Sequence, residues 1–77
     1  MVINKEMCKA ARLFLGWNQI KAAQKTGVAS STINRFEAGK GEMNMENLTK
    51  ILNTFEKEGI EFVENKEKFG VLILKNR

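Results

Sequence analysis

The feature that most constrains this chain is a glycine between two short helical patterns in residues 18–37. Asn18 is a favourable N-cap, and the residues after it predict a helix of about two turns, Gln19–Thr26. Gly27 follows at a position that requires a positive φ, which glycine adopts without a Cβ clash. Apolar side chains at helical spacing then predict a second helix over residues 30–38. The stretch therefore predicts two helices joined by a tight turn.

Small and apolar residues fit this geometry. Ala23 stands four residues before Gly27, where a small side chain lets the second helix approach the first. We expect three apolar side chains to close the elbow between the helices: Ile20, Val28 and Ile33. Two helices joined by a glycine-bearing turn form a helix-turn-helix, which we assign to residues 18–38.

The same residues carry a family resemblance. The chain contains the spaced pattern Q-x3-A-x3-G-V-x4-I-x2-F-E-x-G, preceded by A-A-R-L-F-L-G-W-N-Q and followed by an apolar helix and G-I-E-F-V. Over roughly residues 7–75 it is similar to the Cro and phage-repressor (XRE-type) family of helix-turn-helix transcriptional regulators. The resemblance implies a mainly α, lambda-repressor-like domain of four helices with a C-terminal β-hairpin.

Two further helical patterns flank the motif. Asn4 can cap a helix that ends near Leu15, with an apolar stripe made of Met7, Ala10, Ala11, Phe14 and Leu15. Asn44 can cap a longer helix, from Met45 to about Glu58, whose apolar residues recur at i, i+3, i+4 and i+7. In so small a chain such a stripe is more often core than a partner-binding face.

Arg12 and Trp17 need a structural explanation. Arg12 lies beside core residues on the first helix, which is an unfavourable place for a charge. In the resembling family, an arginine here pairs with the glutamate that closes the second motif helix, here Glu37. The alternative is a solvated Arg12 or a free phosphate contact. We expect Trp17 to pack in the core, since double-stranded DNA presents no free base face on which it could stack.

Beyond Gly59 the pattern changes to the period of a strand. Ile60 and Phe62 alternate with other residues, and residues 71–74 read V-L-I-L, so we predict a β-hairpin over residues 60–75. The second run is apolar on both faces. We therefore expect one side to pack on the fourth helix and the other to be left for a second subunit.

The excess of positive charge lies in the half of the chain that holds the motif. The net charge is +4. Residues 1–40 hold seven basic and two acidic side chains, whereas residues 41–77 hold six basic and seven acidic ones. This distribution favours a polyanionic partner.

Composition gives little support to an enzyme. The chain has no histidine, no tyrosine and one cysteine, Cys8, so it offers no Ser-His or Cys-His pair and no metal cluster. We therefore expect no catalytic residue, cofactor, metal or small-molecule substrate. We interpret Cys8 as a helix residue in a reducing compartment, with a redox-sensing thiol as the alternative.

Length and hydropathy predict a single soluble domain. Seventy-seven residues form a single domain with a small core, which we assign to residues 1–77. No apolar run reaches the roughly 18 residues of a membrane span, and a signal-peptide h-region is lacking. We expect a cytoplasmic protein without a membrane partner, and the resemblance implies a bacterial or phage-encoded one.

In a helix-turn-helix the second helix enters the major groove, and residues near its N-terminus reach base edges. The candidate DNA contacts are Gln19, Ala29, Ser30, Ser31, Asn34, Arg35 and Lys40. Arg35 is the strongest for base reading, because its guanidinium can bind O6 and N7 of guanine. Ser30 and Ser31 can bond a base edge or a phosphate, and Ala29 can meet a thymine methyl group. The others are phosphate candidates. The alternatives are that the serines only cap the helix and that Arg35 is a solvated charge.

We therefore expect a sequence-specific, double-stranded DNA-binding transcriptional regulator, a small repressor that reads the major groove with residues 30–38. The alternative is a protein-interaction module on the same fold, such as an antitoxin or a coactivator-like adaptor. One recognition helix touches too few base pairs for a specific regulator, so we expect a homodimer on two half-sites. The apolar edge at residues 71–74 is the best candidate for its interface. Pairing through the fourth helix on DNA is the rival.

Overall fold

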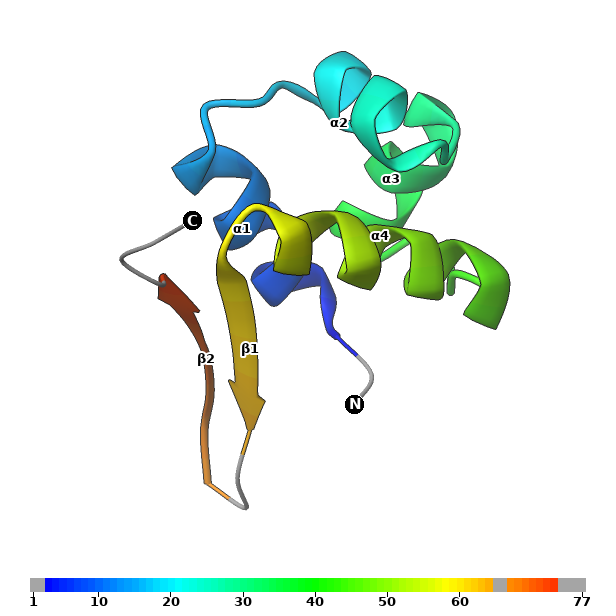
Figure 1. Cartoon of the computed structure of the whole chain (residues 1–77). Helices are drawn as coiled ribbons and strands as arrows, with labels where there is room; N and C mark the ends of the chain where they lie inside the picture. The colour runs from blue at the N-terminus through cyan, green and yellow to red at the C-terminus, as the bar shows by residue number, and fades with distance from the viewer. Residues whose placement is uncertain (1–2, 65–66, 74–77) are drawn as a thin grey trace.

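The computed structural model describes residues 3–64 and 67–73, and in them the chain forms four helices followed by a two-stranded hairpin (Figure 1). The helices are α1 (Lys5–Phe14), α2 (Gln19–Thr26), α3 (Ser30–Glu37) and α4 (Met45–Lys57), and the strands are β1 (Ile60–Glu64) and β2 (Phe69–Ile73). None of these helices has the length and apolar composition needed to span a membrane. The predicted fold class, four helices and a C-terminal hairpin, is confirmed.

Three of the four helices begin at an asparagine, as the sequence predicts. The side chains of Asn4, Asn18 and Asn44 each accept a hydrogen bond from the backbone N–H three residues later, at 2.7–2.8 Å. A cap of this kind typically contributes about 1 kcal/mol. Helix α3 differs, because its N-cap is Ala29, which has no side-chain acceptor.

The turn between α2 and α3 also follows the prediction. Gly27 has φ +79° and lies in the left-handed region, and its N–H donates to the Ala23 carbonyl at 2.9 Å. The chain thus leaves α2 and enters α3 after only two more residues. There is space for a side chain at this position, because an added Cβ would meet nothing within 4 Å. Glycine is needed instead for its backbone conformation, since a residue with a Cβ is strained at this positive φ.

The core lies between the helices and extends under the hairpin. Trp17 is 6% exposed and stacks on Phe55 of α4 at 6.0 Å between ring centroids, and Phe55 meets Phe62 of β1 edge-on at 5.9 Å. Trp17 is therefore a core residue, as predicted. The stripe of α4 is confirmed as well, with Leu48, Ile51 and Phe55 buried.

Three apolar residues predicted for the core are exposed. Ile20 is 63% exposed, because it lies about 200° around α2 from the buried Ala22 and so faces away from the core.

On α1, Phe14 is 50% exposed and Ala10 is also exposed. The buried stripe of α1 is rotated relative to the prediction and runs along Met7, Cys8, Ala11 and Arg12. The structural reason is that Arg12 turns inward to meet Glu37 of α3.

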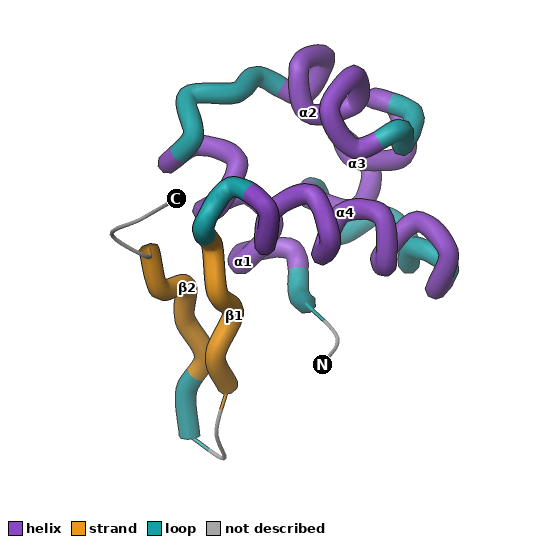
Figure 2. The backbone as a smooth tube through the Cα atoms, in the orientation of Figure 1, coloured by secondary structure: helices purple, strands orange, loops and turns teal. Residues whose placement is uncertain are grey.

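The hairpin is antiparallel and pairs Ile60 with Ile73 and Glu64 with Phe69. Its second strand begins at Phe69, two residues before the predicted run, and Leu74 lies outside the described residues. Strand β1 continues from α4 and packs against it, whereas β2 packs mainly against α1, not against α4 as predicted (Figures 1 and 2). The hairpin is thus supported by two helices, one under each strand.

Candidate nucleic-acid interface

Helix α3 has one face in the core and one face in solvent. Ile33 is 2% exposed, and Phe36 is partly buried against the core. Ser31, Asn34 and Arg35 are exposed. Helices α2 and α3 pack against each other at one end of the molecule, away from the hairpin (Figure 1). This end therefore presents a short helix whose polar side is accessible along its length.

The C-terminal end of α3 is fixed to α1 by a nearly buried ion pair. Arg12 Nη2 donates to Glu37 Oε1 at 2.8 Å, and Arg12 Nε donates to Glu37 Oε2 at 2.9 Å. Arg12 Nη1 donates to the Trp17 carbonyl at 2.9 Å, so all three donor atoms of the guanidinium are used. The pairing that the resemblance implies is confirmed. A solvated Arg12 or a free phosphate contact is excluded by these three bonds.

Cys8 completes this cluster. Its thiol donates to Glu37 Oε2 at 3.8 Å, and its side chain is buried. Burial, and after it the charge of Glu37, raises the pKa of the Cys8 thiol to about 12. The hydrogen bond to Glu37 raises the pKa of Arg12. A buried thiol with a raised pKa is unreactive, so Cys8 has the properties of a structural residue and not of a redox sensor.

Gln19 and Asn34, both predicted to contact DNA, are brought together across the turn. Asn34 Nδ2 donates to Gln19 Oε1 at 3.0 Å, and Gln19 Nε2 donates to Glu37 Oε1 at 3.4 Å. The Gln19 amide thus links the first residue of α2 to the middle and the end of α3. Sequence analysis missed this bridge, because two amide side chains on different helices give no periodic signal.

The N-terminal end of α3 presents the remaining small residues. Ala29 and Ser31 are exposed and Ser30 is half-buried. The carbonyl of Ala29 accepts from the N–H groups of Thr32 and Ile33 at 3.0 and 3.1 Å, so Ala29 occupies the cap position. The serines therefore do not act as the N-cap, which was the alternative to a DNA contact.

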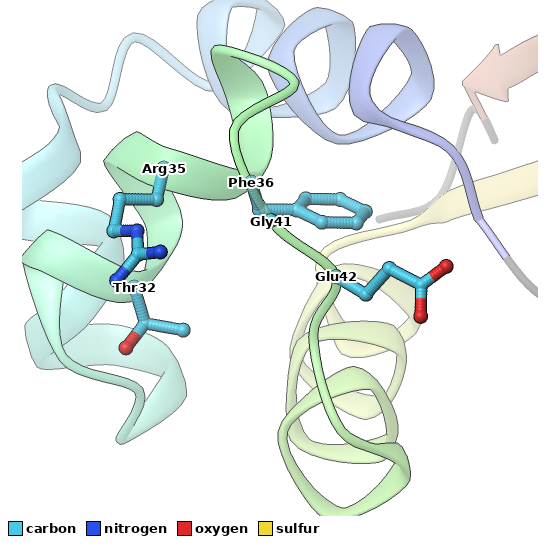
Figure 3. Close-up of a pocket in the computed structure, with 5 residues that line it drawn as sticks. All are labelled: Thr32, Arg35, Phe36, Gly41 and Glu42. Atoms are coloured by element: carbon cyan, nitrogen blue, oxygen red, sulfur yellow. The ribbon is translucent and has the colours of Figure 1, made fainter.

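Arg35 extends from α3 beside the loop that follows it. Figure 3 shows its guanidinium next to Thr32, with the side chains of Phe36 and Glu42 pointing to the opposite side. A Cβ added at Gly41 would lie 3.6 Å from Arg35 Nη2, so the arginine passes close to this glycine. These five residues line an open hollow of about 180 Å³. Arg35 is exposed, and the Glu42 carboxylate does not face it.

Two lysines lie at the same loop. Lys40 is exposed, as expected for a phosphate contact. The Lys5 ammonium, which sequence analysis did not single out, lies beside Gly39, where an added Cβ would come within 2.8 Å of Lys5 Nζ. Lys5 comes from α1, and only the packing of α1 against α3 reveals its position. The loop after α3 therefore combines its own cation with one from another helix.

Comparison with known protein families agrees with this geometry. Residues 9–62 match the family model HTH_3, described as helix-turn-helix. The match begins inside α1 and ends inside β1, so it includes both helices of the motif and the ion-paired residues. A comparison with curated proteins finds no match.

Proposed function

This chain belongs to the HTH_3 family of helix-turn-helix DNA-binding regulators, and on that premise we propose that it is a sequence-specific repressor that reads the major groove of double-stranded DNA with α3. The observation that carries the proposal is the division of α3 into two faces. Ile33 is buried in the core, while Ser31 and Arg35 are exposed along the other side. This accessible side lies in the half of the chain with the excess of positive charge, so a polyanion can reach it, as the second helix of a helix-turn-helix requires.

In this proposal the exposed side of α3 and the residues at its N-terminal end read bases. The Arg35 guanidinium donates two hydrogen bonds to O6 and N7 of one guanine. Ser30 and Ser31 bond a base edge or a phosphate, and the Ala29 methyl group contacts a thymine methyl. Support comes from the exposure of Arg35 and from the absence of a facing carboxylate at Glu42, because an arginine already paired with an acid would bind DNA less readily.

Phosphates are held from both sides of α3. Lys40, on the loop after α3, supplies one cation, and Lys5 supplies a second one beside it. Gln19 is the first residue of α2, where backbone N–H groups lack helical partners and favour an anion. Asn34 acts through its hydrogen bond to Gln19 and so fixes the amide that faces the backbone.

The regulator acts as a homodimer in this proposal. A single eight-residue recognition helix reaches only a few base pairs. Two copies related by a two-fold axis place two such helices on half-sites about 34 Å apart, one turn of DNA. The chain measures 29 × 28 × 20 Å, so two copies side by side have dimensions that suit this spacing.

Selection from random duplexes, followed by gel shifts at several salt concentrations, tests the function. We expect an enriched site with two-fold symmetry and an affinity that falls steeply as salt rises, because several lysines and arginines displace counterions. Affinity that hardly changes with salt would contradict the electrostatic part of the proposal. A chain that enriches no site and binds no duplex at low salt would instead be a protein-interaction module on this fold.

A further inference from the structure

The amide side chains of Gln19 and Asn34 form a chain of hydrogen bonds that ends at a carboxylate. Gln19 Nε2 donates to Glu37 Oε1 at 3.4 Å, and Asn34 Nδ2 donates to Gln19 Oε1 at 3.0 Å. Glu37 also accepts two hydrogen bonds from Arg12 and one from Cys8. Its side chain is 4% exposed, whereas Gln19 is half-buried and Asn34 is exposed. The chain therefore runs from a fixed carboxylate inside the molecule to an amide at the surface.

The carboxylate determines the direction of both bonds in this chain. An ionised carboxylate only accepts hydrogen bonds, whereas an amide has one donating and one accepting end. Gln19 must therefore turn its NH2 group toward Glu37, which places its oxygen toward Asn34. Asn34 must then offer its NH2 group to Gln19, and its Oδ1 is left over. Within residues 3–64 and 67–73 no side chain donates to this oxygen, so it is a free acceptor at the surface of α3.

We propose that Asn34 reads an adenine base, with the direction of its amide set by Glu37 through Gln19; the proposal rests on the proposed function. A phosphate oxygen only accepts, so a phosphate contact would leave Asn34 Oδ1 without a donor. In the major groove the donors are the amino groups N6 of adenine and N4 of cytosine. Adenine also offers N7, which accepts the second N–H of Asn34. Asn34, which the sequence predicts as a phosphate contact, is a base contact in this proposal.

The position of Asn34 on α3 suits this role. It follows Ser31 by three residues and Ser30 by four, so all three lie on one side of the helix. The same polarity gives Gln19 the other partner, because its second Nε2 N–H remains available and a phosphate oxygen accepts. The two amides therefore divide the DNA between them, with the backbone bound by Gln19 and the base by Asn34. Gln19 and Glu37 are positioning residues for the contact at Asn34.

A base analogue tests the atom that Asn34 contacts. Selection from random duplexes with the unchanged chain and with Asn34→Ala locates the base position whose preference depends on Asn34, and we expect adenine there. Replacing that adenine by purine, which lacks the amino group, should weaken binding of the unchanged chain about 5- to 150-fold. The same replacement should hardly affect Asn34→Ala. Another base at that position, or equal losses for the two proteins, would overturn the proposal.

The variant Gln19→Met tests how the amide is positioned. Methionine has a similar length but cannot hold Asn34 by its NH2 group, so the Asn34 amide becomes free to rotate. We expect the ratio of affinities for the adenine and purine duplexes to fall toward 1, although Asn34 itself is unchanged. The control Gln24→Met, at an exposed residue of α2, should keep the ratio of the unchanged chain. A ratio that survives in Gln19→Met would show that Gln19 and Glu37 do not position Asn34.

The outcomes separate this inference from the proposed function. A chain that enriches a site whose base preferences are the same in Asn34→Ala is a sequence-specific regulator in which Asn34 only joins α2 to α3. That result overturns the inference and leaves the function standing. A chain that enriches no site contradicts both.

Discussion

The Arg12 guanidinium on α1 holds both carboxylate oxygens of Glu37, the last residue of α3, at 2.8 and 2.9 Å. The two side chains are 9% and 4% exposed, so the pair is nearly removed from water. Burying either charge alone would be costly, whereas each one compensates the other here. The pair therefore makes the orientation of α3 depend on α1, a helix outside the motif.

Removing one partner of this pair should destabilise the chain far more than removing both. Arg12→Met leaves the Glu37 carboxylate buried without a cation, so we expect the free energy of unfolding to fall by about 3–5 kcal/mol. The double variant Arg12→Met, Glu37→Leu buries no charge and should lie within about 1–2 kcal/mol of the unchanged chain. Urea unfolding measures both. A double variant as unstable as the single one would assign the stabilisation to the bond between Arg12 and the Trp17 carbonyl.

Stability should fall with rising pH above about 9 because of Cys8. Its thiol ionises near the ordinary value of 9.0 in the unfolded chain, but its folded pKa is about 12. The folded state therefore binds more protons between these values, and stability that is present below pH 9 is lost as the pH rises toward 12. The slope attributable to Cys8 is at most about 1.4 kcal/mol per pH unit. Urea unfolding at pH 8, 9 and 10 should show a steeper decline for the unchanged chain than for Cys8→Ala. Equal slopes would contradict the shift.

Local features of the fold could be predicted because neighbouring residues determine them. The caps at Asn4, Asn18 and Asn44 and the turn at Gly27 each depend on a few consecutive residues, and all are confirmed. The stripe of α4 is confirmed because a helix of 13 residues repeats its apolar pattern often enough to fix the buried side.

Features that depend on which neighbour an element meets could not be predicted. Periodicity predicts how wide the apolar stripe of α1 is, but not which way that stripe faces around the helix axis. The inward turn of Arg12 toward α3 sets this direction. The prediction that Phe14 belongs to the buried stripe is therefore wrong. The bridge between Gln19 and Asn34 depends on the angle at which α2 meets α3. The seven DNA contacts stay predictions, since each depends on how a duplex docks.

Arg35 and Lys40 should affect DNA binding in different ways. Arg35→Ala should cost about 1–3 kcal/mol at one base position and relax discrimination there, because it removes a bidentate contact to guanine. Lys40→Ala should weaken binding to all sequences alike and lower the salt slope by about 1. Competition assays with single-base variants of the selected site separate the two effects. Equal, sequence-independent losses would mean that Arg35 contacts only the backbone and that specificity comes from the serines or from DNA shape.

Gln19 and Asn34 should act on DNA as one unit. The Gln19 amide accepts from Asn34 and donates to Glu37, so loss of Asn34 leaves it free to turn away from the phosphate. We expect Gln19→Ala and Asn34→Ala each to weaken binding and the double variant to be little worse than Gln19→Ala, which is a coupling of about 0.5–3 kcal/mol. Fluorescence anisotropy with the selected duplex measures this cycle. A control cycle that combines Gln24→Ala, at an exposed residue of α2, with Asn34→Ala should be additive. Additive losses in both cycles would mean that Asn34 touches the DNA independently of Gln19.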